Sequence, residues 1–402
     1  MADDLQSVEA ALETLLDGVS PLPGETVPCD RAAGRVLAAS IAARLDVPPF
    51  DNSAMDGYAL RAEDAGRVLP VSQRIAAGQA SAPLESGSCA RIFTGGAIPS
   101  GADCVVMQER VEIRDDGVWI PGDIPSGDNV RRRGRDVRAG SELLPTGTRL
   151  EAAALGQLAG QGVTEVEVRR RPRIALLSTG DEVISPGEPL ASGQIYNSNR
   201  PMLKRLLERF GADVVHVASV PDDFATTCSM LAEAAEIADV VVTTGGVSVG
   251  EEDHVKRALK QLGQLDLWRL AMRPGKPLAL GRLSGAHGEA RFIGLPGNPV
   301  SGYVGAWLFL RPLIGELLDC PALKQLPRIH ARSEFATRTQ ARRHYMRVAL
   351  TFDAEGPRAT AFADQNSAVL SSCIAANALA VVPAYSELRE GDTVECLWLV
   401  EA

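Results

Sequence analysis

Apolar positions near the start of the chain recur at the spacing of an amphipathic helix. They are Val8, Ala11, Leu12, Leu15 and Leu16. Ser7 precedes them as a candidate N-cap, and the prolines and glycine of residues 21–24 end the pattern. A second helical pattern occupies residues 150–161. These stretches predict a helical and linking domain formed by residues 1–42 and 139–169.

The texture changes from residue 46 to about residue 138, where short runs of Val, Ile and Phe alternate with Gly, Pro and Ser. The clearest strand candidates are residues 90–93 and 102–107. Short strands separated by turn residues predict a small β-rich domain over residues 43–138, inserted into the helical domain.

Strand and helix patterns alternate strictly after residue 173. The predicted strands are residues 174–177, 213–220, 239–243 and 291–295, and the predicted helices are residues 200–210, 224–237, 255–262 and 299–318. Such alternation is typical of a doubly wound parallel sheet covered on both faces, here over residues 170–325. Strand patterns return at residues 379–382 and 393–399, which predicts a small C-terminal β-barrel, or a sandwich, over residues 326–402. The predicted fold class is therefore multidomain α/β plus β.

Composition and charge narrow the possible functions. Apolar residues make up 45% and charged residues 23%, an ordinary balance for a soluble globular protein. A formal net charge of −10 argues against a general nucleic-acid-binding protein. No apolar stretch approaches the roughly 20 residues of a membrane span. The seven cysteines are scattered without a Cys-x-x-Cys pair, so we expect neither a disulfide framework nor a zinc site. We expect the protein to be cytoplasmic.

Three loops that follow predicted strands hold the residues best suited to binding a ligand, since ligands of open parallel sheets bind at the carboxyl ends of the strands. Glycine lets the backbone approach a ligand closely, and amides at the start of a helix suit phosphate. A tight turn is the structural alternative for any one loop, but three at one sheet edge favour a binding site. The candidate residues are Thr179, Gly180, Gly245, Gly246, Ser248, Pro296, Asn298 and Ser301.

Charged residues lie in and between these loops. The carboxylates of Asp181, Glu182, Asp222, Glu251 and Asp253 lie at or just beyond predicted strand ends, where they suit Mg²⁺ shared with a substrate phosphate. For Asp222 a helix cap is the structural alternative.

Three cations follow in the proline-stiffened segment 268–277, namely Arg269, Arg273 and Lys276. Together they could gather a tetrahedral dianion, because arginine offers forked donors and lysine a point charge. A solvated loop is the alternative.

Five motifs in this order resemble the MoeA family, the molybdopterin molybdenumtransferases, which are related to the E domain of gephyrin. They are Asp51-Asn-Ser-Ala-Met-Asp-Gly-Tyr58, Ser178-Thr-Gly-Asp-Glu182, Thr244-Gly-Gly-Val-Ser-Val-Gly250, Pro274-Gly-Lys-Pro277 and Gly294-Leu-Pro-Gly-Asn-Pro-Val-Ser301. The resemblance implies insertion of molybdate into adenylylated molybdopterin, with release of AMP and dependence on Mg²⁺. It also implies a homodimer of four-domain subunits, in which the β-rich domain of one subunit faces the α/β domain of the other.

The resemblance also implies site residues. It assigns Asp56, Glu182 and Asp253 to catalysis or Mg²⁺ ligation, and further family positions fall on Thr94, Gly95, Asp222, Arg269, Arg273, Lys276, Arg347 and Ser367. Arg269 and Arg273 stand where the family has lysines, so charge is kept while geometry changes. The basic run of residues 129–136 matches a further motif, with a solvated loop as the alternative.

Two other functions stay open at this point. A molybdopterin adenylyltransferase would share the α/β domain, although its family has Gly-Gly-Thr-Gly where this chain reads Gly245-Gly-Val-Ser248. A non-catalytic pterin-binding scaffold is the other. Possible protein partners are the adenylyltransferase and recipient apo-molybdoenzymes.

Overall fold

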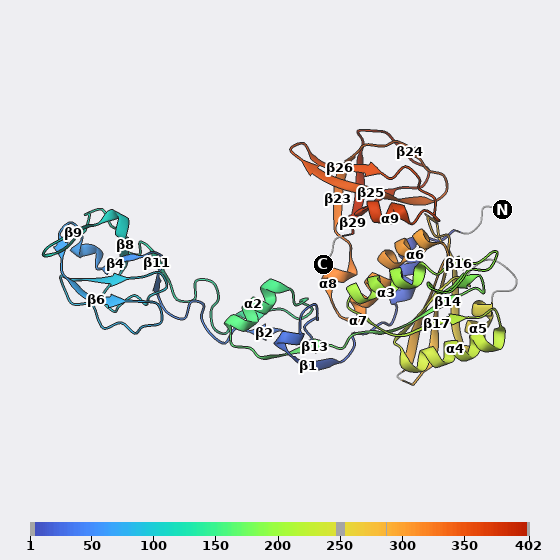
Figure 1. The fold of residues 1–402 in the computed structure, drawn as a ribbon, viewed down its shortest axis with the longest axis horizontal. Coiled ribbons are helices and arrows are strands. Elements are labelled where there is room, and N and C mark those ends of the chain that lie inside the picture. Colours follow the sequence, from blue (N-terminus) through green and yellow to red (C-terminus); the bar gives the residue numbers. More distant parts are fainter. Residues whose placement is uncertain (1–4, 247–253, 287, 400–402) are drawn as a thin grey trace. The chain divides into compact units, whose positions relative to one another are not determined.

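The computed structural model describes residues 5–246, 254–286 and 288–399 of the 402-residue chain (Figure 1). The chain forms two compact units. The larger comprises Met1–Ala38, Gly147–Ala152 and Glu165–Ala402, and the smaller Ala39–Thr146 and Ala153–Thr164. This division is coarser than the four domains expected from the sequence, whose bounds stay a prediction.

The smaller unit is built mainly of short strands. Four of them form a sheet in the order β6-β7-β4-β8, around buried side chains such as Leu60 and Val106. The remaining strands pair as β5-β10-β9, β11-β3 and β12-β2. The strands and 3-10 turns are β2 (Ile41–Ala42), β3 (Asn52–Ser53), β4 (Gly57–Leu60), η2 (Ala62–Asp64), β5 (Val68–Leu69), β6 (Val71–Ile75), β7 (Cys89–Ile92), β8 (Cys104–Met107), η3 (Gln108–Arg110), β9 (Glu112–Arg114), β10 (Gly117–Trp119), β11 (Val130–Arg131) and β12 (Glu142–Leu144). The chain then passes through the larger unit at Gly147–Ala152, and helix α2 (Ala152–Gly160) follows.

The central sheet of the larger unit has six strands in the order β17-β14-β18-β22-β21-β19. Their bounds are β14 (Arg173–Thr179), β17 (Asp213–Val220), β18 (Val240–Thr244), β19 (Gly263–Arg269), β21 (Pro277–Gly285) and β22 (Gly288–Leu295). The first four in sheet order are parallel, as predicted. The antiparallel hairpin of β19 and β21 extends the sheet beside β22 and was not predicted from the sequence.

Helices cover both faces of this sheet, as Figure 1 shows for α4 and α5 on one face and α3, α6 and α7 on the other. Successive strand residues point to opposite faces, so Leu176 packs with the α3 side and Leu177 with the α4 side. The helices are α1 (Val8–Leu16), α3 (Asn199–Arg209), α4 (Phe224–Ile237), α5 (His254–Leu262), α6 (Pro299–Gly305), α7 (Arg311–Leu317) and α8 (Pro321–Lys324).

Two local predictions about helices have clear outcomes. The side chain of Ser7 accepts a hydrogen bond from the amide of Ala10 at 3.0 Å, which confirms it as the N-cap of α1. The predicted helix of residues 299–318 is continuous but contains a π-helical stretch, η4 (Ala306–Leu310). Pro312 follows that stretch and lacks an amide hydrogen, so a regular α-helical bond cannot form there.

The C-terminal region is a closed five-stranded barrel, which confirms the barrel rather than the sandwich. The ring runs β25-β26-β23-β29-β27 and closes by the pairing of β25 with β27. The strands are β23 (Arg328–Ser333), β25 (Arg343–Asp353), β26 (Gly356–Ala361), β27 (Ala378–Val382) and β29 (Thr393–Trp398), with α9 (Ser371–Ala375) and the small ladder of β24 (Thr337–Arg338) and β28 (Glu387–Leu388) beside them. A short strand, β20 (Met272–Arg273), joins the outside of β25.

The remaining paired segments of the larger unit connect these parts. β1 (Gly24–Pro28) pairs with β13 (Glu165–Arg169), and β15 (Val183–Ile184) pairs with β16 (Ile195–Tyr196). One turn of 3-10 helix, η1 (Cys29–Arg31), follows β1. Among the helices of the described residues, none has the length and apolar character needed to cross a membrane.

Candidate functional site

A pocket of about 510 Å³ lies in the larger unit, where β18 and β22 end. This is the edge at which an open parallel sheet binds its ligands. The predicted site residues that line it are Gly245, Gly246, Arg269, Arg273, Lys276, Pro296, Asn298, Ser301 and Ser367. Residues distant in sequence, from both the sheet and the barrel, therefore meet in one cavity.

The floor of the pocket includes the turn that follows β18. Gly245 and Gly246 have φ values of +85° and +63°, which side-chain-bearing residues rarely adopt. The amide of Gly245 donates to the carbonyl of Leu295 at 3.0 Å, so this turn is fixed against the end of β22. A Cβ on Gly245 would lie 2.6 Å from Oγ1 of Thr179, the last residue of β14. Thr179 therefore supports the turn from the neighbouring strand, and its hydroxyl also donates to the carbonyl of Thr244 at 3.2 Å.

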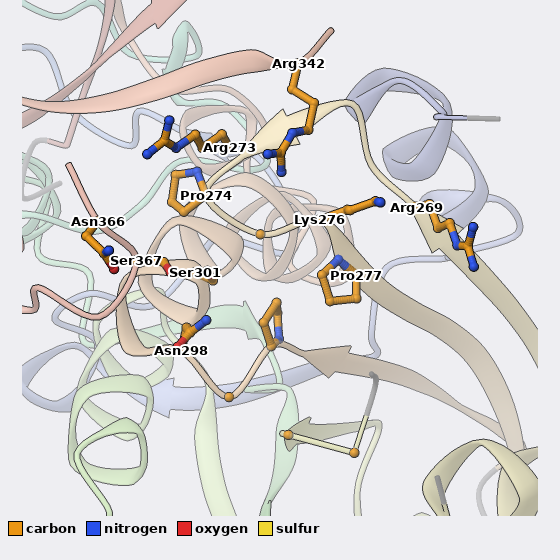
Figure 2. A pocket seen from close by; sticks show the side chains of 15 residues that line it. Arg269, Arg273, Pro274, Lys276, Pro277, Asn298, Ser301, Arg342, Asn366 and Ser367 are labelled. Carbon is orange, nitrogen blue, oxygen red and sulfur yellow. The ribbon is translucent and has the colours of Figure 1, made fainter. Parts of the chain in front are cut away.

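A second turn, between β22 and α6, faces the first. Asn199 in α3 donates from Nδ2 to the carbonyl of Gly297 at 2.7 Å and holds the turn in place. Asn298 is the N-cap residue of α6, and Ser301 in the first turn of that helix also lines the pocket. In Figure 2 Asn298 lies opposite the cationic side chains.

The cations come from the loop between β19 and β21. The amide of Leu270 donates to the carbonyl of Lys276 at 2.7 Å and closes this loop. β20 within the loop pairs with β25 of the barrel, which fixes the backbone of Arg273. Figure 2 shows Arg269, Arg273 and Lys276 along one side of the pocket. Of the described residues that line the pocket, none is acidic, so its potential favours an anion.

The barrel contributes Ser367 together with two residues that the sequence did not single out, Arg342 and Asn366. Arg342 is a fourth cation, and Figure 2 shows its side chain directed towards the loop that carries Pro274 and Lys276. The only hints in the sequence were its place in the basic run before Arg347 and the adjacency of Asn366 to Ser367. The carbonyl of Ser367 accepts a hydrogen bond from the amide of Val300 at 3.1 Å, which joins the barrel loop to α6.

Arg347 is placed behind this loop rather than in the pocket. Its side chain is fully buried in β25 and donates from Nε to Oγ of Ser372 at 3.0 Å and from Nη2 to the carbonyl of Asn366 at 3.2 Å. Burial lowers the pKa of this guanidinium. These contacts are those of a residue that positions the Asn366–Ser367 loop, whereas its assignment to direct substrate binding stays a prediction.

Carboxylates lie near the neighbouring strand ends. Glu182 bends back over Gly180, and Oδ1 of Asp181 accepts a hydrogen bond from the amide of Asp222 at 3.2 Å. The cap of α4 is Asp223, which accepts from the amide of Thr226 at 2.7 Å, so the alternative role of Asp222 as helix cap is wrong. Asp222 instead precedes the capping residue in the chain and stays a site candidate. Ser248 and Asp253 lie outside the described residues.

The smaller unit holds the remaining candidates. Oδ1 of Asp56 accepts hydrogen bonds from both the amide and the hydroxyl of Thr94, each at 2.7 Å. These two bonds hold the pKa of the Asp56 carboxyl below its usual range. Gly95 follows in the same turn with a φ of +80°. Asp56, Thr94 and Gly95, which the family resemblance assigned to the site, therefore lie together in one local cluster.

The basic run of this unit is partly neutralised. Arg132 pairs with Asp51 at 2.7 Å and Arg133 pairs with Asp46 at 2.5 Å. The run also borders a hollow of about 650 Å³ lined by Arg135, Asp136 and Arg138. Both readings of the run therefore have support, since its arginines hold the loop together and still border an open surface.

Comparison with known protein families assigns most of the chain. Residues 6–162 match the MoeA N-terminal region (domain I and II), residues 175–316 a probable molybdopterin binding domain, and residues 331–399 the MoeA C-terminal region (domain IV).

Individual proteins agree with these matches. The chain is 40% identical to the molybdopterin molybdenumtransferase of Haemophilus influenzae, over 77% of this chain and 78% of that protein. It is 36% identical to the protein of the same name from Synechococcus elongatus, over 97% and 98%. A crystal structure of the molybdopterin biosynthesis moeA protein from Pyrococcus horikoshii OT3 superposes with a TM-score of 0.82 at 28% identity, over 98% of this chain and all of that one.

Proposed function

The chain belongs to the MoeA family, and on that basis we propose that it is a molybdopterin molybdenumtransferase, which inserts molybdate into adenylylated molybdopterin and releases AMP. The observation that carries the proposal is the pocket of about 510 Å³, where two glycine turns at strand ends face four cations without an acidic neighbour among the described lining residues. A phosphorylated pterin needs the glycine turns of such a pocket, and a tetrahedral metal oxyanion needs its cations.

The glycine turns are suited to hold the phosphates. Gly245 and Gly246 let the backbone line the pocket closely because they have no side chains, and Asn298 adds an amide side chain at the start of α6. The bond from Gly245 to Leu295 and the bond from Asn199 to Gly297 hold both turns in place, so the turns need no reorganisation when an anion binds.

The cations are suited to hold molybdate. Arg269, Arg273, Lys276 and Arg342 line one side of the pocket, and a dianion there gains charge-assisted hydrogen bonds. Held together, the dithiolene and molybdate react as neighbours rather than by chance encounter. Two Mo–S bonds form as the two thiol protons leave with one oxo group as water. A water molecule then hydrolyses the phosphoanhydride, giving AMP and the pterin phosphate.

Magnesium is part of the proposal, and carboxylates at two strand ends could bind it. Among the described residues no group of three acidic, histidine or cysteine side chains converges on one point. Glu182 and Asp222, at the ends of β14 and β17, can supply one or two carboxylates, and Mg²⁺ of phosphate-transfer sites commonly completes its shell with substrate phosphates and water. When bound, the ion would neutralise phosphate charge. Asp253 is proposed as a further ligand or as a base from the family motif.

Asp56 and Thr94 are proposed to complete the site from a partner subunit. The low pKa of the Asp56 carboxyl keeps it ionised, as a metal ligand or general base must be. A homodimer in which the β-rich domain of one subunit faces the α/β domain of the other would explain why family motifs occur in both compact units. We also propose a cytoplasmic location, which suits seven cysteines that are all free.

The test is an assay with the purified protein, adenylylated molybdopterin, Mg²⁺ and molybdate at low concentration. The proposal expects AMP release that requires molybdate, together with a product that reconstitutes an apo-molybdoenzyme. Transfer of AMP from MgATP to molybdopterin would instead identify an adenylyltransferase. Pterin binding without AMP release would identify a scaffold.

A further inference from the structure

Arg91 lies in strand β7 of the smaller unit, beside the cluster of Asp56, Thr94 and Gly95. Among the described residues its hydrogen bonds go to neighbouring carbonyl and amide groups and not to the Asp56 carboxylate. An arginine in this place can set the position of the acid without occupying the oxygen atoms that a metal ion or a water molecule needs.

The first contact of Arg91 fixes the chain directly after Asp56. Nη1 of Arg91 donates to the carbonyl of Gly57 at 2.9 Å. Gly57 is also held closely from strand β8, because a Cβ on Gly57 would overlap the carbonyl oxygen of Val106. The backbone that carries Asp56 is therefore held between Arg91 and β8.

The second contact fixes the chain directly before Thr94. Cζ of Arg91 lies 4.6 Å from the centre of the Phe93 ring, and Cζ of Arg74 lies 4.5 Å from it. Arg74 is the register partner of Arg91 across β6 and β7, so both side chains leave the sheet on the same face. Two guanidinium groups at this distance stabilise one placement of the ring. The ring precedes the residue that donates two hydrogen bonds to Asp56.

The third contact reaches the residue that holds the backbone of Asp56 itself. Nη2 of Arg91 donates to Oε1 of Gln108 at 2.6 Å. The backbone amide of Gln108 in turn donates to the carbonyl of Asp56 at 3.1 Å. Arg91 therefore connects three segments that are distant in sequence and that all adjoin one carboxylate.

We propose that Arg91 is a positioning residue, which holds the Asp56 carboxylate and the Thr94 turn in the geometry that the reaction requires. The inference rests on the proposed function for the statement that Asp56 takes part in the reaction. A guanidinium suits this role because its planar fork directs two donors to fixed places while its face lies over a ring. The single ammonium group of a lysine does not reproduce that arrangement.

The first measurement is hydrogen exchange of the Thr94 amide in the full chain, because this amide donates to Oδ1 of Asp56 at 2.7 Å. Arg91→Gln should speed the exchange roughly tenfold, the size of one net hydrogen bond. Arg91→Lys keeps the charge but not the fork, so it should speed the exchange as well. The amide of Ala62, which donates to Oδ1 of Asp103 at 2.8 Å in the same unit, is the internal control and should exchange as in the wild type.

The second measurement is the steady-state rate of molybdate-dependent AMP release. Arg91→Gln should lower kcat roughly tenfold, since a misplaced reacting group slows the chemical step. The KM for molybdate should stay close to that of the wild type, because the cations proposed to bind molybdate belong to the other compact unit. Arg114→Gln is the matched control. It removes an arginine of the same unit that lies 5.8 Å from the ring of Trp119, and it should change neither kcat nor the Thr94 exchange.

Gln108→Ala keeps the test decisive if Arg91→Gln does not fold. Gln108 is exposed, so its variant should keep the wild-type melting temperature, and it should speed the Thr94 exchange because Arg91 loses one support. Wild-type exchange of Thr94 in folded Arg91→Gln or in Gln108→Ala would overturn the inference, as would full activity in Arg91→Lys. A wild type that releases no AMP with molybdate would contradict the proposed function instead, and the exchange rates would still decide whether Arg91 positions Asp56.

Discussion

The fully buried side chain of Arg347 donates a hydrogen bond to the carbonyl of Asn366 at 3.2 Å, and this bond ties strand β25 of the barrel to the loop that lines the pocket. The barrel therefore does more than support the sheet domain. It sets the position of Asn366 and Ser367, which close one side of the cavity.

Arg347→Met should lower molybdate affinity because the loop loses its anchor. It should also lower the free energy of unfolding by about 1–3 kcal/mol, since a buried hydrogen-bonded group is left unpaired. Ser372→Ala is the matched control. It removes the bond to Nε of Arg347 and keeps the bond to Asn366, so it should destabilise the fold without changing molybdate affinity. Calorimetric titration with molybdate and chemical denaturation measure the two effects, and equal losses of affinity in both variants would contradict the positioning role.

Gly245→Ala should abolish pterin binding, because the added Cβ would meet Oγ1 of Thr179 at 2.6 Å and displace the turn. Gly187→Ala separates this clash from backbone strain. Gly187 also has a positive φ, of +102°, but its Cβ would meet no atom of the described structure within 4 Å. Both variants should lose about 1 kcal/mol of stability from the left-handed conformation. Only the first should lose affinity for adenylylated molybdopterin, as measured by fluorescence titration.

Lys276→Gln and Arg273→Gln should each raise the KM for molybdate roughly tenfold, the size of one lost charge-assisted hydrogen bond. The same KM should rise with ionic strength in the wild type, because both side chains are exposed and their charges are screened by salt. Steady-state kinetics over a range of molybdate and salt concentrations measure both. A KM that neither variant shifts would remove the cations from the proposed oxyanion site.

Thr94→Val should raise the pKa of Asp56, since the hydroxyl that donates to its carboxylate is lost. The sign follows from the depressed pKa. Its contribution to stability is present above the ordinary aspartate pKa and is lost as the pH falls through the lower, folded value. In the variant this contribution should be smaller, and its loss should be complete at a higher pH. Carboxyl chemical shifts of Asp56 during an acid titration give the two pKa values directly, and identical titrations would show that Thr94 does not matter.

His344 should make the protein less stable in mild acid. Its folded pKa of about 4 lies below the ordinary value of 6.5, so between these values the unfolded chain binds a proton that the folded chain does not. Stability should therefore fall as the pH drops from 6.5 to 4, by about 3 kcal/mol in total. His344→Gln should flatten the dependence in this window. Denaturant unfolding at half-unit pH steps tests it, with an unchanged slope in the variant as the contrary result.

The sequence predicted the parts of the fold that have a regular period. Alternating strand and helix patterns placed β14, β17, β18 and β22 with their helices, and the loops after β18 and β22 line the pocket as expected. It missed the hairpin of β19 and β21, because these strands complete an edge and lack a helix between them. It also missed the π-helical stretch η4, because Pro312 changes the hydrogen bonding of the helix without interrupting its apolar pattern.

The site residues that belong to sequence motifs were predicted, whereas those that only tertiary packing brings to the pocket were missed. Nothing local to Arg342 or Asn366 marks them as pocket residues, since the barrel brings them there. The converse holds for Arg347, which the family resemblance placed at the site and which the structure buries behind it. The period of apolar residues locates a strand, but it does not show which side chains of that strand face a neighbouring domain.

The most direct test of the central claim is the ratio of AMP released to molybdenum inserted, measured with adenylylated molybdopterin and limiting molybdate in the wild type and in Lys276→Gln. The account predicts one AMP for each molybdenum in the wild type, with both quantities falling together in the variant. AMP release that continues at the wild-type rate in the absence of molybdate, or in the variant without insertion, would contradict it.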